Sequence, residues 1–540
     1  MNPSRSIPSL YPQAAGIPAE YDIPTPVSQE NYLLDGRLEP WRGEMQTITS
    51  PIMVDAGAGP APRIIGTCPV LDETAALAAV DAAVKAWDQG CGAWPTMRVT
   101  DRIRCVEEFA TIMSEKRDEM VRLMMWEICK SLPDARAEFD RTVEYIHGTV
   151  DALKDLDRTS SRFVIEKGIY AQIRRAPLGP VLCMGPFNYP LNETFTTLIP
   201  ALIMGNPVIV KTPRMGKLLY GPLLEAFRQA FPAGVANVLY GDRRIIAPIM
   251  KSGKIGVMAF IGSSRAADAL RLMHPHPHRL RCILGLDAKN AAIVMESADM
   301  ELTVRELLDG TLTFNGQRCT AIKIVFVHES RAAELLDRLG AGIKTLPLGM
   351  PWDDGVRITP LPEPGKTAYL TELIADAKAH GAEVVNPGGG QTAMTLFSPA
   401  VLSPVSGAMR AYSEEQFGPV IPVVPYTDMA TPIDSIMKSS YGQQMSIFGS
   451  DPATVAELVD PMVNQVCRVN LNSQCQRGPD TFPFTGRKDS AEGTLSVSDA
   501  LRGFSIRTLV AAKGTPGNKA LISDILRQRR SRFLSTDFLL

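Results

Sequence analysis

The 540-residue chain is predicted to be an α/β protein with two doubly wound domains and a small β-rich arm. Its length exceeds the ~250–300 residues at which a single hydrophobic core stops growing. From residue 178 onward, short apolar runs alternate with helical stretches, which predicts βαβ units and parallel sheets. The predicted division is an N-terminal extension (1–28), a first domain (29–160 and 178–289), an arm (161–177 and 500–513), a second domain (290–499) and a tail (514–540).

Before the alternation begins, the sequence predicts a strand-rich start followed by helices. Asp35-Gly36 is typical of a tight turn, and Asp72 is placed to cap a helix. Lys167-Gly168 lies between residues rich in β-branched and aromatic side chains, which predicts a hairpin. The expected elements are an extended arm (1–28), short strands (31–51), helices (73–87, 100–127 and 134–156), the hairpin (163–174) and a strand (178–184).

Two rounds of alternation follow, and each predicts a doubly wound sheet. The first has strands 208–210, 237–239 and 256–260 with helices 218–230 and 264–274. The second has strands 291–294, 324–327, 384–385, 421–424 and 447–448. A late strand (506–512) and a polar tail with a helical patch near 527–530 complete the chain.

Composition excludes several functional classes. A net charge of −2 gives no electrostatic footprint for nucleic acid or an anionic membrane, and no apolar run is long enough to span a bilayer. Nine cysteines without CxxC spacing argue against a disulfide framework or a zinc site and favour a reduced, cytoplasmic setting. Alternating prolines in His274–His278 spread the imidazoles apart, so no metal site is predicted.

Two segments carry the predicted chemistry. Cys319 lies in Phe-Asn-Gly-Gln-Arg-Cys-Thr, and Asn188 lies in Met-Gly-Pro-Phe-Asn-Tyr-Pro. A thiolate can add to an aldehyde carbonyl, and an amide can donate a hydrogen bond to the oxyanion that forms. We therefore expect Cys319 to be a nucleophile and Asn188 to be its oxyanion donor.

Both segments resemble the aldehyde dehydrogenase superfamily, and the resemblance extends over about residues 30–513. It implies that residues 29–160 and 178–289 bind a nicotinamide cofactor and that residues 290–499 form the catalytic domain. It also implies that the arm exchanges strands between subunits of a homodimer or homotetramer.

The resemblance implies a cofactor site without a GxGxxG motif. Gly262 and Ser263 match the family turn at a helix start, where free N–H groups bind anions. Lys211 ends a predicted strand, and Arg214 stands where NAD-preferring relatives often carry glutamate. Because a guanidinium can bind a 2′-phosphate, NADP is predicted, with NAD as the alternative. The expected cofactor residues are Pro186, Phe187, Lys211, Arg214, Gly241, Gly262, Ser263, Glu415 and Phe417.

Three arginines and a tyrosine narrow the predicted substrate. Arg141, Arg318 and Arg477, with Tyr189, resemble the positions that bind glyceraldehyde 3-phosphate in the non-phosphorylating branch of the superfamily. Several fixed guanidinium groups suit a partly buried phosphate. The implied reaction converts this phosphorylated aldehyde to 3-phosphoglycerate.

One catalytic position departs from the family pattern. Relatives carry a glutamate general base where this chain has Gly285. Asp287 points to the same face of an extended segment and could activate water from a shifted site. Alternatively the acyl group passes to coenzyme A, or turnover has been lost. The rival functions are therefore a dehydrogenase of another aldehyde, a coenzyme A-acylating dehydrogenase and a catalytically silent scaffold.

Overall fold

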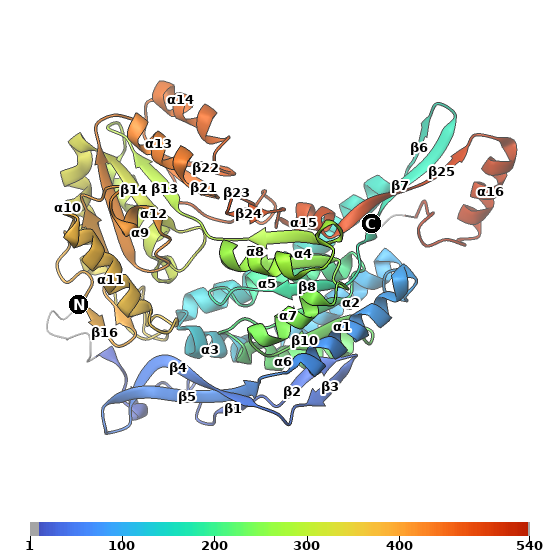
Figure 1. Ribbon diagram of the computed structural model, residues 1–540, viewed down its shortest axis with the longest axis horizontal. Coiled ribbons are helices and arrows are strands. Elements are labelled where there is room, and N and C mark those ends of the chain that lie inside the picture. The colour runs from blue at the N-terminus through green and yellow to red at the C-terminus, as the bar shows by residue number, and fades with distance from the viewer. Residues whose placement is uncertain (1–9, 538–540) are drawn as a thin grey trace.

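The computed structural model describes residues 10–537, which form two α/β units, a projecting arm and a long β-ribbon (Figure 1). The first sheet has a parallel centre, and antiparallel strands close both of its edges. Its order is β24 (Ala491–Glu492), β12 (Arg281–Gly285), β11 (Val257–Ile261), β8 (Val181–Met184), β9 (Val208–Lys211), β10 (Ala236–Leu239), β2 (Asn31–Leu34) and β3 (Arg37–Pro40).

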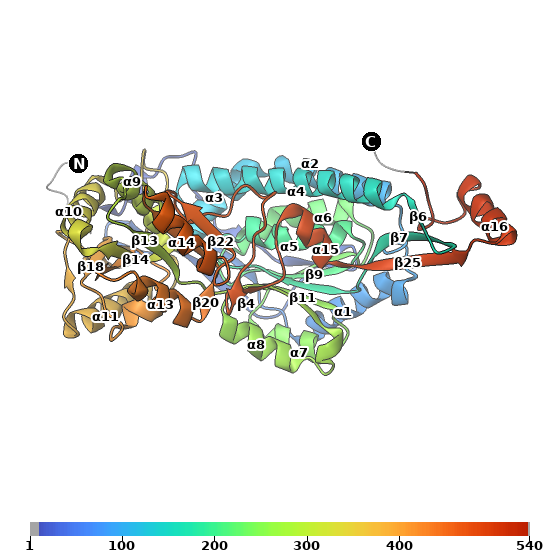
Figure 2. The ribbon, with the colours of Figure 1, turned by 90° about the horizontal axis from the view of Figure 1, so that it is seen from above.

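Helices cover both faces of this sheet, as doubly wound topology requires (Figure 2). The expected start of the first helix is confirmed, because the Asp72 carboxylate accepts a hydrogen bond from the Ala75 N–H at 2.9 Å. One face carries α1 (Glu73–Trp87), α7 (Arg243–Lys251) and α8 (Ser264–Met273). The other carries α2 (Val99–Ser114), α4 (Leu132–Ser160), α5 (Asn192–Ile203) and α6 (Gly221–Ala230).

The second sheet is also parallel apart from its edge strand β15. Separate apolar clusters lie on its two faces, one under α9 and α10 and the other under α11, α13 and α14. Its order is β15 (Glu383–Val384), β18 (Ala400–Ser403), β19 (Val420–Tyr426), β14 (Ile322–His328), β13 (Asn290–Val294), β21 (Gln444–Phe448) and β22 (Arg468–Leu471). Its helices are α9 (Met300–Leu312), α10 (Glu329–Thr345), α11 (Lys366–Ala379), α12 (Arg410–Ser413), α13 (Ala430–Lys438) and α14 (Pro452–Met462).

The predicted helix over residues 100–127 is wrong in one respect. The chain leaves the helix at Lys116, so α2 ends at Ser114 and α3 spans Arg117–Ile128. The break allows α2 to pack on α6 while α3 packs on α4 and β4. The apolar periodicity on either side of Lys116 gave no sign of this change in direction.

The arm consists of β6 (Phe163–Glu166), β7 (Ile169–Pro177) and β25 (Ser505–Lys513), and it projects from the body in both views (Figures 1 and 2). The hairpin prediction is confirmed, since Lys167 and Gly168 form the turn with φ of 48° and 77°. β25 pairs with the whole of β7. The arm leaves Ile165 and Leu509 62% and 57% exposed.

Both chain ends make contacts with the body that the sequence did not predict, although residues 1–9 and 538–540 lie outside the described part. Tyr11 is buried and its hydroxyl donates to the Ala393 carbonyl of the second unit at 2.9 Å, whereas Gln13 donates to Asp55 and Asp22 accepts from Arg63 in the ribbon. α16 (Pro516–Arg527) precedes a tail that returns to the arm, where Gln172 donates to the Ser535 carbonyl. The ribbon beside the N-terminal segment contains β1 (Val27–Ser28), β4 (Met45–Asp55) and β5 (Pro60–Pro69).

No helix within residues 10–537 combines the length and apolar character needed to cross a bilayer. The same residues contain no group of three or more His, Cys, Asp or Glu side chains that could hold a metal ion.

Candidate active site

The predicted site lies where the carboxyl ends of the first sheet's strands face the amino ends of the second sheet's strands. The loop after β8 carries Asn188, and the loop before β14 carries Cys319. The Asn188 side-chain amide crosses between them and donates to the Gln317 carbonyl at 2.7 Å. The structure therefore brings the two predicted catalytic segments into direct contact.

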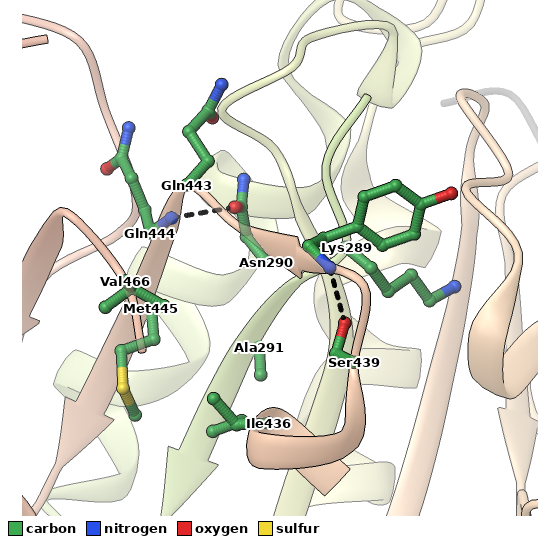
Figure 3. A pocket seen from close by; sticks show the side chains of 10 residues that line it. Lys289, Asn290, Ala291, Ile436, Ser439, Gln443, Gln444, Met445 and Val466 are labelled. Atoms are coloured by element: carbon green, nitrogen blue, oxygen red, sulfur yellow. Dashed lines mark hydrogen bonds between the residues drawn. The ribbon is translucent and has the colours of Figure 1, made fainter. Parts of the chain in front are cut away.

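Two hydrogen bonds to the backbone carbonyl of Cys319 fix the position of this residue. That oxygen accepts from Asn290 Nδ2 at 2.7 Å and from Lys323 Nζ at 3.0 Å. Asn290 opens β13, and its Oδ1 accepts from the Gln444 N–H at 3.1 Å beside a small pocket (Figure 3). The adjacent strands β13 and β21 thus set the position of the nucleophile.

The surroundings of the thiol set its protonation. Burial raises the pKa of Cys319, and the negative charge of Glu193 raises it further. Lys323, a hydrogen bond with Gln443 and the Arg477 charge oppose this rise in pKa. The thiolate therefore forms less readily than in water, and the neighbouring cations and amide limit the penalty.

A buried ion pair holds the loop that presents Asn188. Lys130 Nζ pairs with Glu138 and donates to the Asn188 carbonyl at 2.8 Å, and neither charged side chain is exposed. Glu138 Oε1 in turn accepts from the backbone N–H groups of Leu191 and Asn192 at 3.0 and 3.1 Å. Burial lowers the pKa of Lys130, and the Glu138 carboxylate opposes that shift.

Two of the three predicted arginines share a carboxylate, and acceptors in the protein engage each of the three. Arg141 makes a bidentate contact with Asp480 at 2.8 and 2.9 Å. Arg477 contacts the same carboxylate at 3.3 Å, and its Nη1 forms an ion pair with Glu193. Arg318 Nη2 donates to the carbonyls of residues 309 and 310 at 3.0 and 3.1 Å.

The ring of Tyr189 contacts Phe314 in the nucleophile loop, with ring centroids 6.1 Å apart. Burial raises the pKa of its hydroxyl, whereas the charges of Arg318 and Arg141 act to lower it, so both guanidinium groups lie within electrostatic range. Arg477 acts in the same way on the Cys319 thiol. The arginine cluster, defined as Arg141, Arg318 and Arg477, thus borders the nucleophile.

The structure gives the predicted base Asp287 a partner that the sequence did not suggest. Its Oδ2 accepts two hydrogen bonds from Ser264, from the N–H at 2.7 Å and from the hydroxyl at 2.9 Å. Asp287 therefore binds the start of α8 with this oxygen, whereas its Oδ1 has no hydrogen-bond partner among residues 10–537.

The predicted cofactor residues gather at the carboxyl edge of the first sheet. Lys211 is only 8% exposed, and its ammonium group has no hydrogen-bond or ion-pair partner among residues 10–537. Burial lowers its pKa to about 8. A buried cation without a protein partner suits the hydroxyl or phosphate groups of a nucleotide, so this edge fits a nicotinamide cofactor.

Aromatic rings and a second cation line the same edge. Phe187 meets Phe417 edge-to-face, with ring centroids 5.9 Å apart, and the Arg214 guanidinium lies 5.4 Å from the centroid of the Phe187 ring. Arg214 also pairs with Glu363 at 2.8 Å, so a 2′-phosphate has to compete with a carboxylate there. Pro186 precedes Phe187 in the loop that follows β8.

Two of the predicted cofactor residues, Ser263 and Glu415, already bond to other protein groups. Ser263 uses its hydroxyl to cap α8, and Asp287 takes the next N–H, so the helix start offers fewer free donors after Gly262. Glu415 pairs with Lys323 at 2.5 Å and accepts from the backbone of residue 288 at 3.2 Å. Burial raises the pKa of Glu415, and the Lys323 charge opposes that shift. Gly241, with φ of 149°, follows β10 and leads into α7.

Sequence reasoning missed several buried polar residues at this site. Glu193 is the clearest case, because it is a carboxylate in a helix whose residues are all buried. A charge in such an apolar run is a detectable signal, since buried charges need a partner or a function. Lys130, Glu138, Asn290, Lys323 and Gln443 were missed because only tertiary contacts connect them to Cys319.

A profile of the aldehyde dehydrogenase family matches residues 60–510. The chain belongs to the aldehyde dehydrogenase family. It is 32% identical over 435 residues to a NADP-dependent glyceraldehyde-3-phosphate dehydrogenase from Streptococcus equinus, covering 78% of this chain and 87% of the relative. Identity to a malonate-semialdehyde dehydrogenase from Listeria monocytogenes serotype 4a (strain HCC23) is 27%, over 83% of this chain and 90% of that protein.

A solved structure supports the same assignment. The NADP complex of the NADP-dependent glyceraldehyde-3-phosphate dehydrogenase from Bacillus halodurans C-125 matches with a TM-score of 0.81 at 29% identity. The match covers 90% of this chain and 100% of that one. The predicted aldehyde dehydrogenase fold is therefore confirmed, and the family implies an oxidoreductase that uses NAD or NADP.

Proposed function

We propose that this aldehyde dehydrogenase oxidises glyceraldehyde 3-phosphate to 3-phosphoglycerate with NADP. The arginine cluster beside Cys319 carries the proposal, because its three guanidinium groups offer a phosphate several directed donors close to a nucleophile. The relatives that oxidise this substrate support the same choice.

The chemistry begins at the thiol. Cys319 loses its proton and its sulfur adds to the aldehyde carbon, giving a tetrahedral thiohemiacetal. The second N–H of the Asn188 amide, which the Gln317 carbonyl leaves free, is the proposed donor to the oxyanion. The Cys319 backbone N–H is the proposed second donor.

Lys211, Arg214, Phe187 and Phe417 are the residues that would hold NADP. When bound, the cofactor supplies the hydride acceptor that turns the thiohemiacetal into a thioester. Burial of Lys211 strengthens its contacts with anionic groups, and the exposed Arg214 adds a contact available only to a 2′-phosphate.

The carboxylates within the arginine cluster favour a second candidate substrate class. Asp480 and Glu193 oppose the charge of Arg141 and Arg477, which weakens the attraction for a phosphate dianion. A small aldehyde with a carboxylate or hydroxyl group would require less positive charge. Glyceraldehyde 3-phosphate and malonate semialdehyde are therefore the two aldehydes to compare.

A stopped-flow measurement of NADPH formation tests the function. With glyceraldehyde 3-phosphate and NADP, we expect a burst near one equivalent per active site and then a steady rate. A burst only with malonate semialdehyde selects the second candidate. A steady rate that requires coenzyme A identifies acyl transfer, and no burst with either aldehyde identifies a silent scaffold.

We also propose that the chain forms a homodimer or homotetramer through its arm and works in the cytoplasm. Exposed apolar side chains on the arm, including Ile165 and Leu509, support the first point. Nine unpaired cysteines support a reducing compartment. Light scattering of the full chain would give the oligomeric state, and polar substitutions at both residues should dissociate it.

A further inference from the structure

The proposed reaction needs a base for its last step, and Gly285 has no side chain to provide one. Four carboxylates lie around the nucleophile and its arginines: Asp287, Glu415, Asp480 and Glu193. Asp287 is bound by Ser264, Glu415 by Lys323 and Asp480 by Arg141. These contacts tie the first three groups to a helix start, to a lysine and to the substrate-binding arginines.

Glu193 differs in its place beside the oxyanion donor, because its backbone N–H donates to the Tyr189 carbonyl at 3.2 Å. It lies in the first turn of α5, five positions after the oxyanion donor Asn188, and is 7% exposed. Its Oε1 pairs with Arg477, whereas its Oε2 has no hydrogen-bond partner among residues 10–537. A nearly buried carboxylate oxygen without a protein donor can accept a hydrogen bond from a water molecule.

Glu193 is also the carboxylate with the largest electrostatic effect on the Cys319 thiol. Among the charged groups that act on the Cys319 thiol, its influence is the largest, and neither Asp287 nor Glu415 is among them. Arg477 acts on the same thiol and forms the ion pair with Glu193. Glu193 also follows the loop of Asn188, whose amide donates to the Gln317 carbonyl two residues before Cys319, so the pair lies on the side of the site that holds the nucleophile.

We propose that Glu193 is the general base that hydrolyses the thioester at Cys319, in place of the carboxylate absent from position 285. The inference rests on the proposed function, because it requires an acylated cysteine. Glu193 removes a proton from water as the water oxygen bonds to the thioester carbon. The tetrahedral intermediate then breaks its C–S bond, and the sulfur leaves with the electron pair and takes up the proton. The carboxylic acid departs.

Arg477 positions this base. Its Nη2 donates to the Leu495 carbonyl at 3.3 Å and its Nε contacts Asp480 at 3.3 Å, so the guanidinium is anchored from two sides. The ion pair to Glu193 then fixes the carboxylate while leaving Oε2 for water. Arg477 is a positioning residue in this scheme.

The test uses p-nitrophenyl acetate, an activated ester that acylates a reactive cysteine without aldehyde or NADP. In the parent enzyme, p-nitrophenolate release reports acylation as a burst and hydrolysis as the steady rate. We expect Glu193→Gln to keep the burst and to lower the steady rate by about 10²–10⁴-fold, the usual effect of losing a general base. A burst that disappears, or a steady rate that is unchanged, overturns the assignment.

A rescue variant separates a base from a merely structural carboxylate. A Cβ placed on Gly285 would lie 3.4 Å from Ile261 Cγ1 and 3.6 Å from Leu495 Cδ1, which are ordinary contacts. In the Glu193→Gln background, Gly285→Glu should therefore restore the steady rate at least about tenfold. Gly285→Gln is the matched control and should restore nothing. If neither or both restore hydrolysis, Glu193 does not act as the base.

Two further results keep this inference separate from the proposed function. Loss of activity on glyceraldehyde 3-phosphate with normal ester hydrolysis would overturn the substrate assignment and leave Glu193 in place. Adding coenzyme A to the ester assay tests Glu193 independently of the aldehyde substrate. If only coenzyme A discharges the acetyl group of the parent enzyme, water is not the acceptor and the role of Glu193 is overturned. A parent enzyme without any ester burst overturns both.

Discussion

Two segments that follow parallel strands of the same sheet each carry a carboxylate, and these carboxylates have different partners. After β12, Asp287 binds Ser264 at a helix start. After β8, Glu193 has a single ion pair, with Arg477, and acts on the Cys319 thiol. The comparison teaches that the partners of a carboxylate decide its role, because an acid committed to backbone donors is a poor base.

The largest effect is expected from removing the sulfur of Cys319. Cys319→Ser should lower aldehyde oxidation by at least ~10³-fold, because a serine hydroxyl ionises far less readily than a thiol and is a weaker nucleophile. NADPH absorbance measures the loss, and fluorescence titration with NADP should show unchanged binding. Residual activity near the parent level would mean that Cys319 is not the nucleophile.

The next largest effect is expected at the buried ion pair of Lys130 and Glu138, which supports the Asn188 loop. Lys130→Met leaves Glu138 charged and buried, which should destabilise the fold by about 3–5 kcal/mol. The urea unfolding midpoint measures the change. Arg228→Met breaks an exposed pair with Glu225 and is the matched control, with a midpoint expected close to the parent value. Equal effects of the two variants would contradict the importance of burial.

The pH dependence of acylation tests whether Glu193 faces the sulfur. Below the pKa of the Cys319 thiol, the burst rate should rise up to about tenfold per pH unit because the thiolate is the nucleophile. Since the Glu193 charge raises that pKa, Glu193→Gln should shift the profile to lower pH and speed the burst near neutrality. A profile that does not move would place Glu193 too far from the thiol for the proposed role.

Removing the other carboxylate should affect stability more than chemistry. Asp287→Asn weakens the acceptor at the start of α8 and should cost about 1 kcal/mol, which is typical of a helix cap. Thermal unfolding measures this cost, and the burst-to-steady ratio in the ester assay serves as the second readout. A steady rate that collapses while the burst survives would return Asp287 to the base role.

The smallest expected effect lies at the exposed pair beside the cofactor edge. Arg214→Glu removes the proposed 2′-phosphate contact and should shift the NADP/NAD preference towards NAD by roughly fivefold, because exposed ion pairs are weak. Glu363→Gln frees Arg214 and should shift the same kcat/KM ratio in the opposite direction. If both variants shift it in one direction, Arg214 does not contact the cofactor phosphate.

Much of the fold could be predicted because its signals are local. The cap at Asp72, the turn at Lys167-Gly168 and the apolar strands each depend on a few neighbouring residues, and the structure has them where expected. The break at Lys116 could not be predicted, because packing of α3 on β4 decides the direction of the chain there. The folded-back tail likewise depends on contacts with distant residues such as Gln172.

The family and the absence of a side chain at position 285 follow from residue identity and spacing alone, which also predict Cys319 and Asn188 as the catalytic pair. Which carboxylate has the largest electrostatic effect on the sulfur depends on the tertiary structure. Electrostatic influence and hydrogen bonding depend on distance and burial, and the Asn188 and Cys319 segments meet only when the carboxyl ends of the first sheet's strands face the amino ends of the second sheet's strands.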